Sequence, residues 1–231
     1  MSLVSYRLDQ SIATITLDDG KANALSPAMQ AQIHGALDQA VADRAVVVLT
    51  GRTGMWSGGF DLGVLRGGGE AALGMVRGGF VLAERLLAFP RPVIVACSGH
   101  AVAMAAFLLL SADYRIGAAG PYKITANEVA IGLAMPRAAI EICRQRLAPA
   151  HLHRALVLAE VYAPDDAIAA GWLDRTVPPA ELADAARAAA ARLAQLDAAA
   201  HTATKLRVQD ATLRALRAAL DGDDLLLPSP R

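Results

Sequence analysis

The sequence of 231 residues lacks the features of a disulfide-stabilised or nucleic-acid-binding protein. Only two cysteines occur, Cys97 and Cys143, and both lie in apolar surroundings, so we expect buried free thiols rather than a disulfide or a metal site. Lys and Arg total 22, as do Asp and Glu, and this formal net charge of +0 argues against a dedicated nucleic-acid-binding protein.

Long apolar runs and targeting signals are also missing. The longest apolar helix that the pattern predicts, near 101–110, is too short to span a bilayer, and no signal peptide stands at the N-terminus. No metal-ligand spacing links His151, His153 and His201. We therefore expect a cytoplasmic protein with no membrane partner and no metal.

Hydrophobic residues make up 55% of the chain, which is enough for a substantial core. The pattern of the first part predicts an α/β fold, and the region after Pro136 is predicted to be all helical. We divide the chain into a core with its following helices over 1–198 and a C-terminal helix with a frayed tail over 199–231.

Apolar periodicity predicts the order of the elements. Alternation over 4–8 and 12–17 predicts an antiparallel hairpin, and Ser26 followed by Pro27 predicts a helix start. Further strands are expected at 45–50, 93–97, 114–117, 122–125 and 172–177. Helices are expected at about 27–43, 71–88, 101–111, 136–147, 149–160, 164–171, 178–196 and 199–220.

The stretch 92–113 is the centre of the predicted core. A continuous apolar run over 93–97 is followed by Ser98-Gly99-His100, which we interpret as a turn, and then by a buried helix. In such an arrangement the first free N–H groups of the helix point at the turn and favour negative charge. Taken alone, the stretch fits a plain β-α unit of the core better than a site.

A second stretch, 53–62, is rich in glycine and follows the predicted strand 45–50. Ligands bind beyond the carboxyl ends of strands in open α/β sheets. Glycines also permit a tight turn that leaves N–H groups unpaired. By itself the stretch fits an ordinary surface turn, since it completes no phosphate-binding fingerprint.

Together, these motifs resemble the crotonase (enoyl-CoA hydratase/isomerase) superfamily over about 4–220. The matching pieces are KANAL at 21–25, WSGGFDL at 56–62, PVIVA at 92–96 with GHA at 99–101, ADYRI at 112–116, NEVAIG at 127–132, and the segment 163–174. The resemblance implies a crotonase-like spiral of β-β-α units with a C-terminal all-helical region. It also implies an acyl-CoA thioester substrate, no separate cofactor, and a homotrimer or dimer of trimers.

The resemblance implies two catalytic backbone amides. The N–H groups of Phe60 and Met104 would hold the thioester oxygen, on which negative charge gathers when the neighbouring carbon loses a proton. The family has three glycines where this chain has Ala103-Met104-Ala105. We expect these positions to be helical, since Met and Ala form helices better than Gly.

The acid and base residues decide the chemistry. Family hydratases use two glutamates, and the resemblance places Phe107 at the first position and Glu128 at the second. Burial beside Val129 and Ile131 would raise the pKa of Glu128 toward the range of a general base. Alternatively, Glu128 caps the following segment or pairs with Arg137.

A single base suffices for a Δ3-Δ2-enoyl-CoA isomerase, which is the reaction that the resemblance favours. The alternatives are an enoyl-CoA hydratase, another enolate reaction, or an acyl-CoA-binding homologue without activity. The family usually carries a further helix after the segment that 199–220 resembles, so acyl-chain length stays undetermined.

The resemblance also implies a set of substrate contacts. They come from the backbone of two alanines at the adenine end of CoA, from the glycine-rich loop, and from two aromatic side chains: Ala22, Ala24, Ser57, Gly58, Gly59, Asp61, Leu62, His100 and Phe107. His100 fits a satisfied buried histidine as well as a residue of the thioester pocket.

Three polar positions have structural interpretations. Asp61 is expected to cap the helix after its loop, and Asp113 is expected to pair with Arg115. Lys205 is expected to be solvated, although the family often places a basic residue that reaches a CoA phosphate in its last helices.

Overall fold

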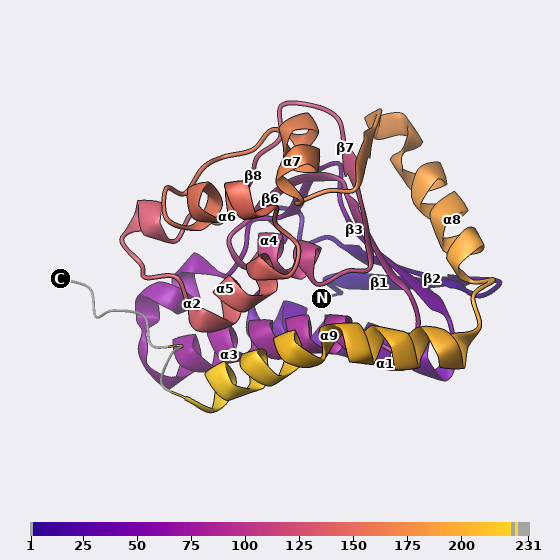
Figure 1. Cartoon of the computed structure of the whole chain (residues 1–231), viewed down its shortest axis with the longest axis horizontal. Coiled ribbons are helices and arrows are strands. Elements are labelled where there is room, and N and C mark those ends of the chain that lie inside the picture. The colour runs from indigo at the N-terminus through magenta and orange to yellow at the C-terminus, as the bar shows by residue number, and fades with distance from the viewer. Residues whose placement is uncertain (1, 223–224, 226–231) are drawn as a thin grey trace.

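The computed structural model describes residues 2–222 and 225 and contains a six-stranded sheet. The strands follow the order β1 (Val4–Asp9), β2 (Ile12–Leu17), β3 (Val46–Gly51), β5 (Val93–Cys97), β7 (Tyr114–Ala118) and β9 (Arg175–Val177). The strands β1, β2, β3 and β7 of this sheet are labelled in Figure 1. β1 and β2 form the predicted antiparallel hairpin, and every other neighbouring pair is parallel. The mixed sheet agrees with the predicted α/β class.

A second, smaller sheet consists of β4 (Gly54–Ser57), β6 (Gly99–Val102) and β8 (Ile124–Thr125), all parallel. The strands β3, β5 and β7 of the large sheet are each followed directly by one of these short strands, and helices then lead to the next pair. The chain therefore repeats a β-β-α unit and winds through both sheets, which confirms the predicted spiral.

Nine α-helices and two short 3₁₀ helices are found among the described residues. The α-helices are α1 (Pro27–Ala42), α2 (Leu62–Gly67), α3 (Gly69–Leu87), α4 (Met104–Leu110), α5 (Arg137–Arg144), α6 (Pro149–Leu156), α7 (Pro164–Ala170), α8 (Leu182–Leu193) and α9 (Ala198–Asp221). The 3₁₀ helices are η1 (Val129–Ile131) and η2 (Pro179–Glu181). α1 begins as predicted, because Ser26 accepts a hydrogen bond from Met29 N at 3.2 Å and Pro27 follows it.

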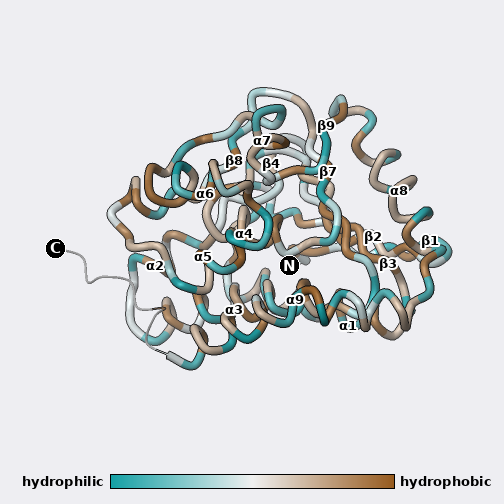
Figure 2. The backbone as a smooth tube through the Cα atoms, in the orientation of Figure 1, coloured by the Kyte–Doolittle hydropathy of each residue, from teal (hydrophilic) through white to brown (hydrophobic). Residues whose placement is uncertain are grey.

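Alternate residues of the large sheet face two separate hydrophobic clusters. Odd-numbered strand residues such as Val47 and Val95 pack in the main core with α1, α3 and α4, whereas Val48 and Ile94 pack against α8 on the other face. Figure 2 shows hydrophobic stretches in β2 and β3, while teal and brown alternate along α9. Burial on both faces explains the continuous apolar runs of the central strands.

Two expected boundaries near the site were wrong. The segment 98–100 was predicted to be a turn, yet Gly99 and His100 belong to β6, and the next helix starts at Met104 rather than at 101. β4 was missed inside the glycine-rich stretch. A Cβ added at Gly99 would lie 2.0 Å from the Gly54 carbonyl carbon, so glycine there allows β6 to approach β4.

Smaller boundary differences lie elsewhere. Residues 122–123 and 172–174 are not strand, and α2 is an additional helix between the glycine-rich loop and α3. α9 extends to Asp221 and packs against α3 and α5. The division of the chain after residue 198 stays a prediction. The predicted frayed tail falls mostly on 223–224 and 226–231, outside the described residues.

The expected pair between Asp113 and Arg115 was wrong, as was the expectation of a solvated Lys205. Arg115 binds Asp174, with Nη2–Oδ1 at 2.6 Å, and Asp113 Oδ2 accepts from Lys205 Nζ at 2.7 Å. The Lys205 side chain is only 5% exposed. Both partners lie far along the chain, so these ion pairs tie the C-terminal segments to the start of β7.

We predict that Asp113→Ala lowers the free energy of unfolding by about 3 kcal/mol, because it leaves the Lys205 ammonium buried without its carboxylate. Urea denaturation measures this loss. The control is Asp210→Ala, which removes an exposed pair with Arg214 on the same helix and should cost less than about 0.5 kcal/mol. Equal losses in the two variants would contradict the importance of the buried pair.

Candidate active site

The glycine-rich loop is anchored to the segment 21–25 through Asn23, which is fully buried. Asn23 Nδ2 donates to the carbonyl oxygens of Leu17 at 2.9 Å and Trp56 at 3.1 Å, and its backbone has φ 49. Gly58 N donates to Ala22 O at 2.8 Å, and Leu25 N donates to Gly59 O at 2.8 Å. The segment 21–25 and the glycine-rich loop are therefore held side by side by hydrogen bonds of the Asn23 side chain and of the main chain.

The residues that precede the two predicted catalytic amides share an unusual backbone. Gly59, before Phe60, has φ 86, and Ala103, before Met104, has φ 53 with ψ −124. Met104 is helical, as predicted. Ala103, which was also expected to be helical, is not, because α4 begins only at Met104. A positive φ at an alanine is strained. The glycine that the family has at this position was the signal that could have pointed to it.

The two segments touch each other. A Cβ added at Gly59 would lie 2.7 Å from Val102 O and 3.5 Å from Met104 N. On the α3 side, a Cβ at Gly79 would meet the Phe60 ring at 2.6 Å and Met104 Cγ at 3.2 Å. Glycines in both segments therefore permit an approach that a side chain would block. Gly79 is a residue that sequence reasoning missed.

Both amides are free of internal hydrogen bonds. Within the part of the chain that the structure describes, neither Phe60 N nor Met104 N donates to any acceptor. Unpaired backbone N–H groups are rare in folded proteins unless water or a ligand satisfies them. Two neighbouring free amides are therefore available to an acceptor that comes from outside the chain.

Glu128 follows β8 and precedes η1. It is 8% exposed, and its Oε2 is buried with no hydrogen-bond partner among the described residues. Burial raises the pKa of Glu128 to about 7, opposed by a hydrogen bond from its own backbone N–H. The side chain makes no helix-capping bond, so the capping alternative was wrong.

The strand pairing brings Glu128 into the neighbourhood of the amides. β6 pairs with β8 through Val102 and Thr125, and Ala103 N donates to Thr125 O at 2.9 Å. Met104 thus lies two residues after the end of β6, and Glu128 lies three residues after the end of β8. Glu128 also interacts with Cys143 of α5, whose thiol pKa is raised by burial and by the charge of Glu128. Cys97 and Cys143 are both free and buried, as predicted.

Several predicted contact residues of the loop have structural roles. Ser57 is fully buried, and its Oγ donates to Asn23 O at 2.7 Å and accepts from Gly59 N at 3.2 Å. Asp61 caps α2 as predicted, accepting from Gly63 N at 2.7 Å. Leu62, in contrast, is 57% exposed.

The remaining predicted contacts differ in accessibility. Ala22 and Ala24 are half-buried, and Ala24 N already donates to Asp19 Oδ2 at 3.0 Å. His100 Nδ1 accepts from Lys123 N at 3.0 Å, which fits a satisfied histidine. Phe107 is 1% exposed and stacks on Phe80 with ring centroids 6.2 Å apart, so its ring belongs to the core.

Two cavities of the molecule are not lined by these groups. The first, of about 400 Å³, is lined mainly by residues of α9. The second, of about 380 Å³, is lined by residues of α6, of α7 and of the segment that joins them. Phe60, Met104 and Glu128 line neither cavity. Over residues 2–222 and 225, no three potential metal ligands cluster. No helix in the same part of the chain is long and apolar enough to cross a membrane.

Comparison with known proteins gives one consistent family. The family model for enoyl-CoA hydratase/isomerase matches residues 7–230. A crystal structure of an enoyl-CoA hydratase/isomerase family protein from Pseudomonas syringae is 50% identical, with a TM-score of 0.94 and 96% of each chain covered. An apo structure of a Mycobacterium tuberculosis enoyl-CoA isomerase is 47% identical, with a TM-score of 0.92 and 95% of this chain and 96% of that chain covered.

A relative named for the other reaction is also found. A probable enoyl-CoA hydratase from Mycobacterium avium is 30% identical over 190 residues, which are 80% of this chain and 72% of the relative. The names of these relatives thus include both an isomerase and a hydratase. The family match over nearly the whole chain, together with the β-β-α spiral, establishes that this chain belongs to the enoyl-CoA hydratase/isomerase family.

Proposed function

We propose that the protein is an acyl-CoA enzyme, and specifically a Δ3-Δ2-enoyl-CoA isomerase in which Glu128 is the single acid and base. The observation that carries this proposal is the buried Glu128 carboxyl, whose Oε2 has no partner among the described residues and whose pKa is about 7. Such a carboxyl is suited to take up and return one proton near neutral pH.

In the proposed reaction, the thioester oxygen of a 3-enoyl-CoA accepts hydrogen bonds from Phe60 N and Met104 N. Glu128 removes a proton from C2, and the electrons of the broken C–H bond form a dienolate whose charge falls on the thioester oxygen. Glu128 then returns the proton to C4, which leaves the double bond between C2 and C3. Fixed donors at such an oxygen contribute several kcal/mol to lowering the barrier.

A hydratase is the second candidate, because the relative from Mycobacterium avium carries that name. Hydration needs a positioned water, which family hydratases hold between two carboxylates. At the position of the first carboxylate this chain has Phe107, a buried phenyl ring that transfers no proton. This substitution favours the isomerase. The cytoplasmic location, the homotrimer or dimer of trimers and the absence of a separate cofactor remain predictions.

We predict that Glu128→Gln lowers isomerase activity at least about 100-fold, because an amide cannot carry the proton between C2 and C4. The formation of conjugated 2-enoyl-CoA, followed by absorbance, measures the rate. Binding of a CoA ester should be retained. The matched control is Glu141→Gln on α5, which removes a partly exposed carboxylate and should leave the rate unchanged. Turnover of Glu128→Gln at the wild-type rate would contradict the assignment.

The pH dependence of activity follows from the same carboxyl. Because the unprotonated form of Glu128 accepts the proton, kcat/KM should rise about tenfold per pH unit below pH 7 and level off above it. A profile measured in the free-enzyme regime, with substrate well below KM, tests this. A flat profile between pH 5 and 8 would show that no group with this pKa acts as the base.

Gly59→Ala tests the placement of the amides. The new Cβ would lie 2.7 Å from Val102 O at a backbone with φ 86, so the loop must shift and carry Phe60 N with it. We expect kcat to fall at least about tenfold. Gly74→Ala is the control, since no atom lies within 4 Å of the added Cβ on α3. Equal kcat values for Gly59→Ala and wild type would contradict the role of the loop.

A further inference from the structure

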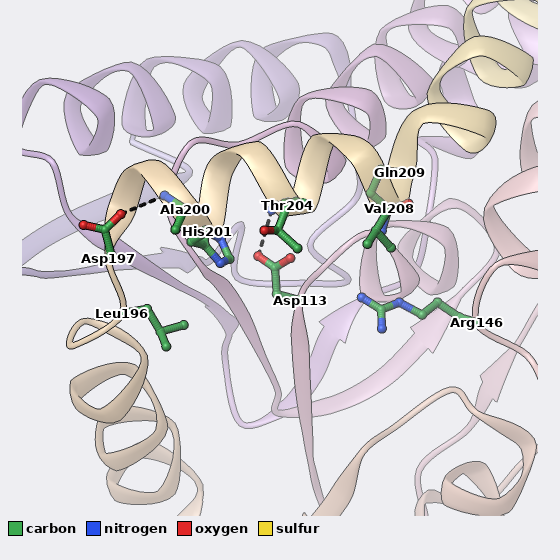
Figure 3. Close-up of a pocket in the computed structure, with 10 residues that line it drawn as sticks. Asp113, Arg146, Leu196, Asp197, Ala200, His201, Thr204, Val208 and Gln209 are labelled. Atoms are coloured by element: carbon green, nitrogen blue, oxygen red, sulfur yellow. Dashed lines mark hydrogen bonds and ion pairs between the residues drawn. The ribbon is translucent and has the colours of Figure 1, made fainter.

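The cavity of about 400 Å³ lies beneath the first half of α9 (Figure 3). Its walls also include Asp113, just before β7, and Arg146, which follows α5. In Figure 3 these two side chains face the same side of α9. Because Phe60, Met104 and Glu128 are absent from its lining, the cavity is distinct from the candidate active site.

α9 presents a stripe of polar side chains to this cavity. His201, Lys205 and Gln209 follow one another at intervals of four residues, which places them on one face of the helix. Gln209 is 5% exposed, and its side-chain amide has no hydrogen-bond partner in the described part of the chain. The His201 Nε2 atom is buried and likewise unpartnered among those residues.

Arg146 faces this stripe and forms no direct ion pair among the described residues. Its Nη2 donates to Ala112 O at 3.0 Å, but its Nε is buried without a hydrogen-bond partner among them. Burial and the nearby Arg115 charge lower the pKa of Arg146, and the charges of Asp174 and Asp113 oppose this shift. A buried cation without a directly bound counter-ion is costly for a fold.

The acidic groups around the cavity are already engaged. Asp113 binds Lys205, Asp174 binds Arg115, and Asp197 caps α9 by accepting from Ala200 N at 2.8 Å. Two of the three carboxylates are therefore neutralised by other cations, and the third satisfies the start of the helix. Asp174 and Asp113 act on Arg146 without a direct ion pair, so the unpartnered Nε of Arg146 is left for an acceptor from outside the described chain.

We propose that this cavity is a second ligand site, which binds a small anion through Arg146 with Gln209 and His201 as hydrogen-bonding partners. The ligand carries a phosphate or a carboxylate, since both present two anionic oxygens that a guanidinium binds with paired hydrogen bonds. Leu196, 47% exposed, and Val208, 72% exposed, lie on the lining and offer apolar contact to the body of such a ligand.

The test is titration of the whole chain with inorganic phosphate and, separately, with butyrate, at constant ionic strength made up with chloride. Thermal unfolding and calorimetry should show saturable binding of at least one of these probes. Butyrate alone would identify a carboxylate ligand, and phosphate alone would identify a phosphorylated one. The absence of saturable binding by both probes would overturn the proposal.

Variants locate the site. Arg146→Gln and Gln209→Leu should each weaken binding at least tenfold, because each removes one of the proposed donors. Arg144→Gln is the matched control, since Arg144 lies two residues away, is 59% exposed and pairs with Glu141 outside the cavity. Binding by both Arg146→Gln and Gln209→Leu at wild-type affinity would overturn the proposal. Gln209→Leu keeps the test valid if Arg146→Gln fails to fold.

Discussion

The contact between the loop at Gly59 and the start of α4 is the constraint on which the site depends. Only hydrogen fits where a Gly59 side chain would stand, because Val102 O would lie 2.7 Å from an added Cβ. Gly59 and Ala103 both have positive φ, and each is followed by an amide with no acceptor among the described residues. The backbone is thus strained at Ala103 beside two free amides, and strained residues of this kind cluster at active sites.

The number of carboxylates in the site then distinguishes isomerisation from hydration. Free amides stabilise the enolate of any acyl thioester, so they do not by themselves distinguish isomerisation from hydration. Glu128 is buried just beyond β8, the strand that pairs with β6, whereas Phe107, where a hydratase has its other glutamate, packs on Phe80 in the core. One proton carrier in a dry environment suits a proton shift along the acyl chain better than the addition of water.

The sequence predicted the large sheet well because β3 and β5 are buried on both faces and give continuous apolar runs, while β1 and β2 show the alternation of a hairpin with one solvated face. In the small sheet, β4 and β6 were missed because each has only four residues and begins with a glycine, whereas β8 lies within the strand predicted at 122–125. Resemblance predicted Phe60, Met104 and Glu128 as site residues, but not the strain at Ala103. The wrong pairing of Asp113 with Arg115 has a similar cause. Arg115 pairs with Asp174, which lies 59 residues further along the chain, and Asp113 pairs with Lys205, which lies 92 residues further along.

A crystal structure with a bound, unreactive analogue of 3-enoyl-CoA is the most direct test of the central claim. The account predicts the thioester oxygen at about 2.7–3.1 Å from both Phe60 N and Met104 N, with the Glu128 carboxyl facing C2 and C4. A thioester oxygen bound elsewhere, or a Glu128 carboxyl turned away from the acyl chain, would contradict it.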